Sequence, residues 1–199
     1  MIRNNNRGQI FSNEYEHSPS FLCINLTKYI KDTKVKKVYF SKEVVNAINE
    51  FTLQEINTKP NLNLDEIGGF LLGKYLRTPE NVFDIGIEIF CAAEEGVEKS
   101  PSNLVIGVEA NIVLANLMDN FPELCLLGWF HTHPGYTPYL SRIDLECNHN
   151  LFYVQPFQVA IVLDPLTDRF DTGIFSQKID ASMNNNIDYS EWINWKDLI

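Results

Sequence analysis

The sequence has few basic residues and no long apolar run. Over 199 residues it contains 16 Lys and Arg against 26 Asp and Glu, which gives a formal net charge of -10. No segment approaches the ~20 apolar residues of a membrane-spanning helix, and the start lacks the apolar core of a secretory signal. Binding to a phosphate backbone relies on clustered Lys and Arg, so the acidic balance argues against nucleic acid. We therefore expect a cytoplasmic protein with neither membrane nor nucleic-acid partners.

Cysteine is also scarce. The four residues Cys23, Cys91, Cys125 and Cys147 are scattered and form no Cys-x-x-Cys pair. This spacing indicates neither a structural zinc knuckle nor a small disulfide framework. We expect reduced thiols that mostly pack in the interior.

What remains is the pattern of one mixed domain. Hydrophobic residues make up 45% of the chain, enough for a full core at this length. Residues 35–40 alternate like a strand, and Ser41 is placed to cap an amphipathic helix that runs to residue 56. Further strands are predicted at 66–73, 82–92, 104–109, 124–130, 157–164 and 171–178, and further helices at 110–121 and from Ser141. This order predicts an α/β (α+β) fold with a curved, mostly antiparallel sheet flanked by helices.

The two ends differ from the middle. Residues 1–34 are interpreted as a partly mobile N-terminal extension, because the first 20 are polar and aperiodic. Residues 35–178 form the predicted main domain. The tail, 179–199, carries Trp192 and Trp195 at helical spacing, and we expect this short helix to pack back on the domain.

The stretch WFHTHPGYTPYLSRID at 129–144 carries the strongest indication of chemistry. On an extended strand, His131 and His133 lie on one face, about 6.6 Å apart along the backbone, and can converge on one ion. A catalytic zinc takes three nitrogen or oxygen ligands and keeps a fourth position for water. Asp144 is the nearest candidate for the third ligand. The pattern predicts a metallohydrolase.

The same residues also have purely structural interpretations. Ser141 is a good helix N-cap, with Asp144 reaching back as in a capping box. A lone His-x-His pair is more often a surface or packing feature than a ligand pair. Here an apolar strand, the turn at Pro134-Gly135 and a helix start follow one another. That order would bring all four side chains together, which favours the metal site.

The spacing His131-x-His133, seven residues, then Ser141-x-x-Asp144 resembles the zinc motif of the JAMM proteases, the catalytic branch of the MPN (JAB) domains. WFHTHPGY followed by LS is similar to the sequence around the ligand pair in deubiquitinating and deneddylating members. The resemblance spans residues 35–175. It implies a JAB/MPN-type, cytidine-deaminase-like architecture, with one catalytic Zn2+ per chain held by His131, His133 and Asp144.

The family also uses a glutamate on an earlier strand, followed after two residues by glycine and an apolar run that ends in glycine. Glu66 in EIGGFLLG, residues 66–73, fits this pattern. An isolated glutamate is usually solvated, but a buried strand would carry Glu66 into the fold. Strand alternation would send Asp65 to the opposite face. The resemblance implies that Glu66 is the general base and Ser141 the oxyanion donor.

The resemblance implies an isopeptidase that cleaves the amide after the C-terminal glycine of ubiquitin or a ubiquitin-like protein conjugated to lysine. Two alternatives stay open, namely processing of a ubiquitin-like or sulfur-carrier precursor, and a non-catalytic MPN scaffold. The family's substrate-binding insertions correspond to 92–103, a charged loop that could form a flap, and less clearly to 150–155. Both segments are short, so strong linkage selectivity is not expected. Pairing is common in the family, which leaves an MPN partner or a homodimer open.

Overall fold

The structure is a computed structural model that describes residues 15–59, 61, 63–147, 155–179 and 191–199. The strands of its main sheet are β1 (Phe21–Asn25), β2 (Val35–Ser41), β3 (Gly68–Arg77), β4 (Phe83–Ala92), β7 (Cys125–Thr132), β8 (Val159–Leu163), β9 (Asp171–Ser176) and β10 (Ile193–Asn194). A separate hairpin contains β5 (Val97–Ser100) and β6 (Asn103–Ile106). The helical segments are α1 (Lys42–Thr58), α2 (Val108–Asn120), α3 (Arg142–Cys147), and the 3-10 turns η1 (Leu26–Lys28) and η3 (Trp195–Leu198).

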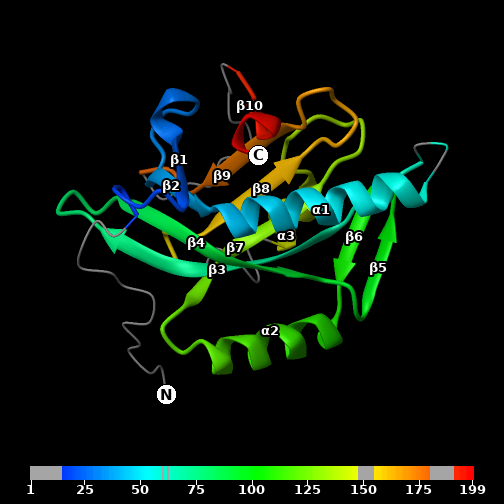
Figure 1. Ribbon diagram of the computed structural model, residues 1–199, viewed down its shortest axis with the longest axis horizontal. Coiled ribbons are helices and arrows are strands. Elements are labelled where there is room, and N and C mark those ends of the chain that lie inside the picture. Colours follow the sequence, from blue (N-terminus) through cyan, green and yellow to red (C-terminus); the bar gives the residue numbers. More distant parts are fainter. Residues whose placement is uncertain (1–14, 60, 62, 148–154, 180–190) are drawn as a thin grey trace.

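The main sheet has the strand order β1-β2-β4-β3-β7-β8-β9-β10 (Figure 1). Within the described sheet, the neighbours β2 and β4 are parallel, as are β7 and β8. The remaining pairs are antiparallel. The sheet is curled and helices lie outside it, so the predicted mixed α/β class with a mostly antiparallel sheet is confirmed.

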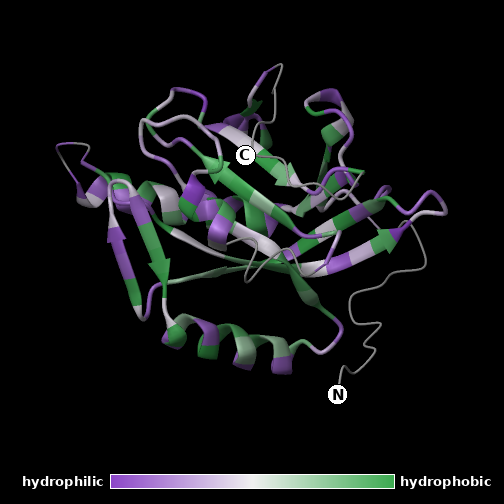
Figure 2. Cartoon of the chain, turned by 180° about the vertical axis from the view of Figure 1, so that it is seen from behind, coloured by the Kyte–Doolittle hydropathy of each residue, from purple (hydrophilic) through white to green (hydrophobic). Residues whose placement is uncertain are grey.

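Strand alternation divides the core into two layers on opposite faces of the sheet. The layer that includes α1 contains Leu71, Phe130 and Ile161. The layer that includes α2 contains the adjacent residues Phe70, Trp129 and Ala160. Figure 2 shows apolar residues running through the strands between the helices. Because His131 follows Phe130 on β7, its side chain lies on the same face as Trp129.

Helix α1 begins where the sequence predicts. The Ser41 side chain accepts a hydrogen bond from the Val44 backbone N–H at 3.1 Å, which satisfies one of the free donors of the first turn. Val44, Val45 and Ile48 are buried against the sheet. The predicted cap is confirmed, and the helix packs an apolar face on the sheet as predicted, except that Leu53, which the apolar spacing also assigns to this face, is exposed.

Two predicted elements between β4 and β7 are wrong in detail. Residues 92–103 are not a plain loop, because 97–100 pair with 103–106 as an antiparallel hairpin. The charged residues Glu98 and Lys99 hide this short strand from a hydropathy pattern. The predicted strand at 104–109 ends at Ile106, since Gly107 is the N-cap of α2.

Both edges of the sheet come from near the ends of the described chain. β1, which the sequence pattern did not predict, pairs with β2, and β10 pairs with β9. The predicted tail helix is reduced to η3, because Ile193–Asn194 is a strand. Trp195 is fully buried, and its ring meets Phe40 edge-on with 5.5 Å between centroids.

The predicted division into 1–34, 35–178 and 179–199 stays a prediction. Residues 1–14 of the extension and 180–190 of the tail lie outside the described residues. Among the helices that the structure does describe, none has both the length and the apolar character needed to cross a membrane.

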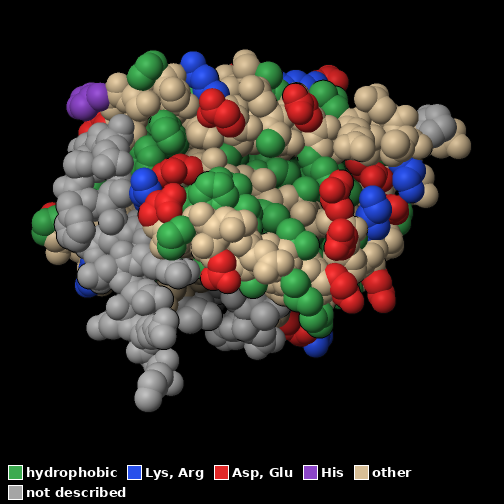
Figure 3. Space-filling model, turned by 60° about the horizontal axis from the view of Figure 1, so that its bottom comes forward, with side chains coloured by type: hydrophobic (Ala, Val, Ile, Leu, Met, Phe, Trp, Pro, Cys, Tyr) green, Lys and Arg blue, Asp and Glu red, His purple; other side chains and the backbone are tan. Residues whose placement is uncertain are grey.

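Figure 3 shows one face of the molecule, on which carboxylates occur at several separate places among apolar side chains. On α2, Val108, Ile112 and Val113 are exposed. The acidic side chains visible on this face therefore do not form a single cluster.

Candidate metal centre

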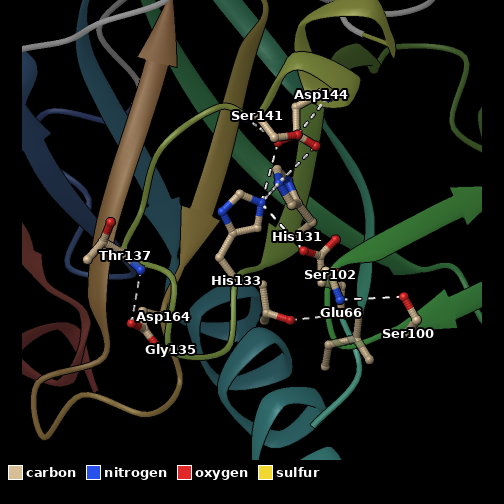
Figure 4. Close-up of polar contacts among 12 residues, drawn as sticks. Glu66, Ser100, Ser102, His131, His133, Gly135, Thr137, Ser141, Asp144 and Asp164 are labelled. Carbon is tan, nitrogen blue, oxygen red and sulfur yellow. Dashed lines mark hydrogen bonds and ion pairs between the residues drawn. The ribbon is translucent and has the colours of Figure 1, made fainter.

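Strand β7 and the residue that follows it carry both histidines. His131 is a residue of β7, and His133 follows the strand but still donates its backbone N–H to the Leu163 carbonyl at 2.9 Å. This bond extends the pairing with β8 past the end of β7. Their side chains are almost fully buried, with residue exposures of 0% and 2%, and the two Nε2 atoms lie 3.1 Å apart (Figure 4).

Asp144, in the first turn of α3, completes a triangle with the two imidazoles. Its Oδ1 lies 3.4 Å from His131 Nε2, and its Oδ2 lies 3.4 Å from His133 Nε2. Donor atoms ~2.0–2.1 Å from a tetrahedral zinc are themselves separated by about 3.3 Å. The three side chains therefore fit zinc in spacing and in ligand type, and among the described residues they form a group that could hold a metal ion.

The ionisation of these groups also suits metal binding. Burial lowers the pKa of His131, although the neighbouring Asp144 opposes that shift. Burial alone would raise the pKa of Asp144, but hydrogen bonds with His131, His133 and Ser141, together with the charge interaction with His131, hold it well below its usual range. At neutral pH this leaves His131 neutral and Asp144 ionised, as metal ligands must be.

The imidazole rings are oriented by packing. Metal-binding histidines usually donate a hydrogen bond from their second ring nitrogen to a polar group. Among the described residues, neither Nδ1 atom has such a partner. Instead, Trp129 stacks on His131 with 4.1 Å between ring centroids, and Tyr139 meets His133 edge-on at 4.9 Å. Sequence reasoning missed these two aromatic contacts.

Ser141 and Asp144 form the reciprocal pair that the capping-box interpretation predicts. The Ser141 N–H donates to Asp144 Oδ2 at 2.6 Å, and the Asp144 N–H donates to Ser141 Oγ at 3.2 Å. A serine hydroxyl that accepts one hydrogen bond can still donate its own hydrogen. The structural and the chemical interpretations of Ser141 are therefore compatible.

Glu66 lies beside the triangle, just before β3. It is 6% exposed, and its Oε1 is 3.7 Å from His133 Nε2. Burial raises the pKa of Glu66 to about 7, while His133 opposes this rise and Asp144 adds to it. Asp65 instead pairs with Lys59, with 3.0 Å between Oδ2 and Nζ. Of the two neighbouring carboxylates, Glu66 is the one at the site.

The backbone around Glu66 is tied to two other elements. Its N–H donates to the Ser100 carbonyl at 2.8 Å, and the next N–H, of Ile67, donates to Thr132 Oγ1 at 3.0 Å. At Gly68 an added Cβ would lie 2.4 Å from the Phe130 carbonyl oxygen, so only glycine allows this approach of β3 to β7. Sequence reasoning found Glu66 but missed Ser100 and Thr132.

The loop between β7 and α3 is held by Asp164, which sequence reasoning also missed. Its buried carboxylate accepts from the Gly135 N–H at 2.9 Å and from the Thr137 N–H at 3.3 Å (Figure 4). Thr137 has φ +63°, which is uncommon for a β-branched residue. The only sequence feature that could have indicated this role is the position of Asp164 directly after an apolar strand.

Some predicted features lie outside the described residues. Residues 150–154 of the second predicted insertion are among them.

Comparison with known proteins bears on this site. The profile of the family described as "JAB1/Mov34/MPN/PAD-1 ubiquitin protease" matches residues 33–156, more than half of the chain. The chain belongs to this family. The predicted resemblance to JAB/MPN domains is therefore confirmed.

Individual relatives support the family assignment of this JAB/MPN chain. COP9 signalosome complex subunit 5 of Caenorhabditis elegans is 32% identical over 175 residues, which cover 81% of this chain and 43% of that protein. The 26S proteasome regulatory subunit rpn11 of Schizosaccharomyces pombe is 26% identical over 102 residues, which cover 51% of this chain and 32% of that protein. The human AMSH-like protease is 42% identical over 62 residues, covering 31% and 14%. The chain spans less than half the length of each of these relatives.

Proposed function

We propose that this JAB/MPN chain is a zinc-dependent isopeptidase that cleaves the amide after the C-terminal glycine of ubiquitin or a ubiquitin-like protein and so releases it from lysine. The observation that carries the proposal is the buried triangle of two Nε2 atoms and one carboxylate, with sides of 3.1 and 3.4 Å. A second buried carboxylate, that of Glu66, lies 3.7 Å from it. The family description, which names a ubiquitin protease, supports the substrate class.

His131, His133 and Asp144 would hold one zinc ion, because their atoms and spacing suit it. When bound, zinc polarises an amide carbonyl and lowers the pKa of a water molecule. The burial of the three ligands keeps competing solvent away from them.

Glu66 acts as general base and then as general acid. It takes a proton from the attacking water and passes it to the leaving lysine amine. Burial raises the pKa of Glu66 in the metal-free site, and a carboxyl group with a raised pKa is suited both to accept and to return a proton. Its position next to His133 brings it within reach of a water molecule at the site.

Ser141 donates its hydroxyl hydrogen to the oxyanion that develops on the attacked carbonyl. One such contact contributes roughly 3 kcal/mol to the transition state. The Asp144 N–H donates a hydrogen bond to Ser141 Oγ, which keeps the hydroxyl in place for this role.

The proposal includes a cytoplasmic location and a protein partner. Cys23, Cys91 and Cys125 are free thiols, which suits a reducing compartment. Two of the relatives are named as subunits of larger complexes, which supports an MPN partner or a second copy of this chain.

The test is hydrolysis of lysine-linked ubiquitin dimers by the zinc-loaded protein. We expect release of free ubiquitin, loss of activity on chelation and recovery on addition of zinc. A ubiquitin with a peptide fused after its last glycine, assayed in parallel, separates isopeptide cleavage from precursor processing. A zinc-loaded protein that is inert on both substrates would favour the non-catalytic scaffold.

A further inference from the structure

We infer that Glu55, a buried carboxylate outside the metal motif, is a positioning residue for Glu66. This inference rests on the proposed function of Glu66. Glu55 lies in the last turn of α1 and is only 8% exposed. It is neither a ligand candidate nor part of the sequence pattern of the family.

The two oxygens of Glu55 reach two different segments. Oε1 accepts the backbone N–H of Asp65 at 3.2 Å, and Oε2 pairs with Lys99 Nζ at 3.0 Å. Asp65 immediately precedes Glu66, whereas Lys99 belongs to β5 of the hairpin. One carboxylate therefore joins α1 to the segment ahead of β3 and to the hairpin.

These contacts close a ring around Glu66. The Glu66 N–H donates to the carbonyl of Ser100, the residue after Lys99, at 2.8 Å. Glu55 thus fixes the backbone of Glu66 from both sides, through Asp65 on one side and through Lys99 and Ser100 on the other. Figure 4 shows the hydrogen bond between Glu66 and Ser100 beside the histidines.

Packing leaves open space beside this part of the molecule. A cavity of about 320 Å³ borders Glu55, Ile67 and Lys99, although Ile67 itself is buried and bonded to Thr132 on β7. Without the ring of polar contacts, the chain ahead of Ile67 would have room to shift towards that space. The ion pair between Lys59 and Asp65 is a second tie, but Lys59 is 37% exposed and such pairs are weak.

The local demands of the helix do not explain a glutamate at this position. A negative charge in the last turn is disfavoured by the helix dipole. Burying a carboxylate is also costly unless it is paired and hydrogen-bonded. The two contacts to Asp65 and Lys99 supply the compensation, which assigns Glu55 to the tertiary arrangement around Glu66.

The experiment compares Glu55→Ala with Glu50→Ala, a matched change at an exposed position of the same helix. Lysine-linked ubiquitin dimers serve as substrate, and zinc content and Glu66 amide hydrogen exchange are measured with kcat and KM. We expect kcat of Glu55→Ala to fall by about 10- to 100-fold, as for a catalytic group misplaced by about 1 Å. KM and zinc content should stay within about twofold, exchange of the Glu66 N–H should accelerate, and Glu50→Ala should behave as wild type.

An unchanged kcat in folded Glu55→Ala, or an equal loss in Glu50→Ala, would overturn the inference. If Glu55→Ala does not fold, Glu55→Gln decides, because it keeps an acceptor for Asp65 and loses only the ion pair with Lys99. Its kcat should then fall by about 3- to 10-fold at unchanged KM, and wild-type turnover would contradict the proposal. If wild type cleaves no dimer, the proposed function has failed. Hydrogen exchange then decides the positioning role alone, since equal exchange at Glu66 in the Glu55 and Glu50 variants would refute it.

Discussion

The metal side and the Glu66 side of the centre are built in different ways. His131, His133 and Asp144 come from one stretch of chain that runs from β7 through a loop into α3. Glu66 is held instead by α1, by the hairpin and by β7, which are distant from one another in sequence. A contiguous segment can therefore determine the proposed ligand set, whereas the position of Glu66, the proposed proton-transfer group, depends on the assembled domain. Substitutions on the metal side should abolish metal binding and activity, and substitutions on the Glu66 side should lower the rate of hydrolysis.

The largest effect is expected from the metal side. His133→Ala removes one of the three proposed ligands, so zinc binding and hydrolysis should both be abolished. Metal analysis of the purified variant, together with the ubiquitin-dimer assay, checks this. Stoichiometric zinc retained in the double variant His131→Ala, His133→Ala would contradict the ligand assignment.

Glu66→Gln tests the other side. The variant keeps the size of the side chain but loses the base, so turnover should fall by a factor of ~100 to 10,000 with zinc retained. Asp65→Asn is the matched control, because Asp65 pairs with Lys59 and not with the site. Activity lost only in Asp65→Asn would show that the wrong carboxylate has been assigned.

Ser141→Ala sharpens the comparison, because Ser141 belongs to the metal segment without being a ligand. Loss of the oxyanion donor should lower kcat by ~100-fold or more, with little change in substrate affinity. Loss of the cap should cost about 1 kcal/mol of stability. Steady-state kinetics and urea unfolding measure the two effects separately, and a less stable variant with normal turnover would leave Ser141 only its structural role.

The smallest effect concerns stability against pH in the protein stripped of metal. Burial raises the pKa of Glu66 to about 7, so between the unfolded value and pH 7 the folded state holds a proton that the unfolded state releases. Stability should therefore fall as pH rises through this window, by about 1–3 kcal/mol. Glu66→Gln should remove this loss.

Urea unfolding of wild type and Glu66→Gln at pH 5 and pH 8 measures that difference. His131, whose pKa is lowered by burial, has the opposite pH dependence in an overlapping range. Its contribution is common to both proteins and cancels in the comparison. Equal pH dependence in the two proteins would contradict the expectation.

The sequence predicts those parts of the molecule that depend on neighbouring residues. Ser41 caps α1, the two histidines converge from β7, and Ser141 and Asp144 form a helix start, each of which follows from local spacing. The mixed sheet follows from the order of apolar runs.

The sequence does not predict contacts that exist only after distant segments pair. Ser100 accepts from Glu66 because the hairpin folds beside β3, and Thr132 meets Ile67 because β3 pairs with β7. Strand β5 of the hairpin was not predicted, because its charged residues interrupt the apolar pattern. Asp164 and Glu55 are single acidic residues that accept hydrogen bonds from other segments of the chain, and no spacing rule indicates them.

The closing of the sheet by β1 at one edge and β10 at the other has a consequence for biosynthesis. Trp195 fills the core against Phe40, so that layer stays open until residue 195 has left the ribosome. Until then the first two residues of β9, which pair with β10 in the folded domain, lack that partner, and unpaired strand edges favour aggregation. The domain should complete its folding only after nearly all of the described chain has been made, and a nascent chain that stalls earlier should depend on chaperones.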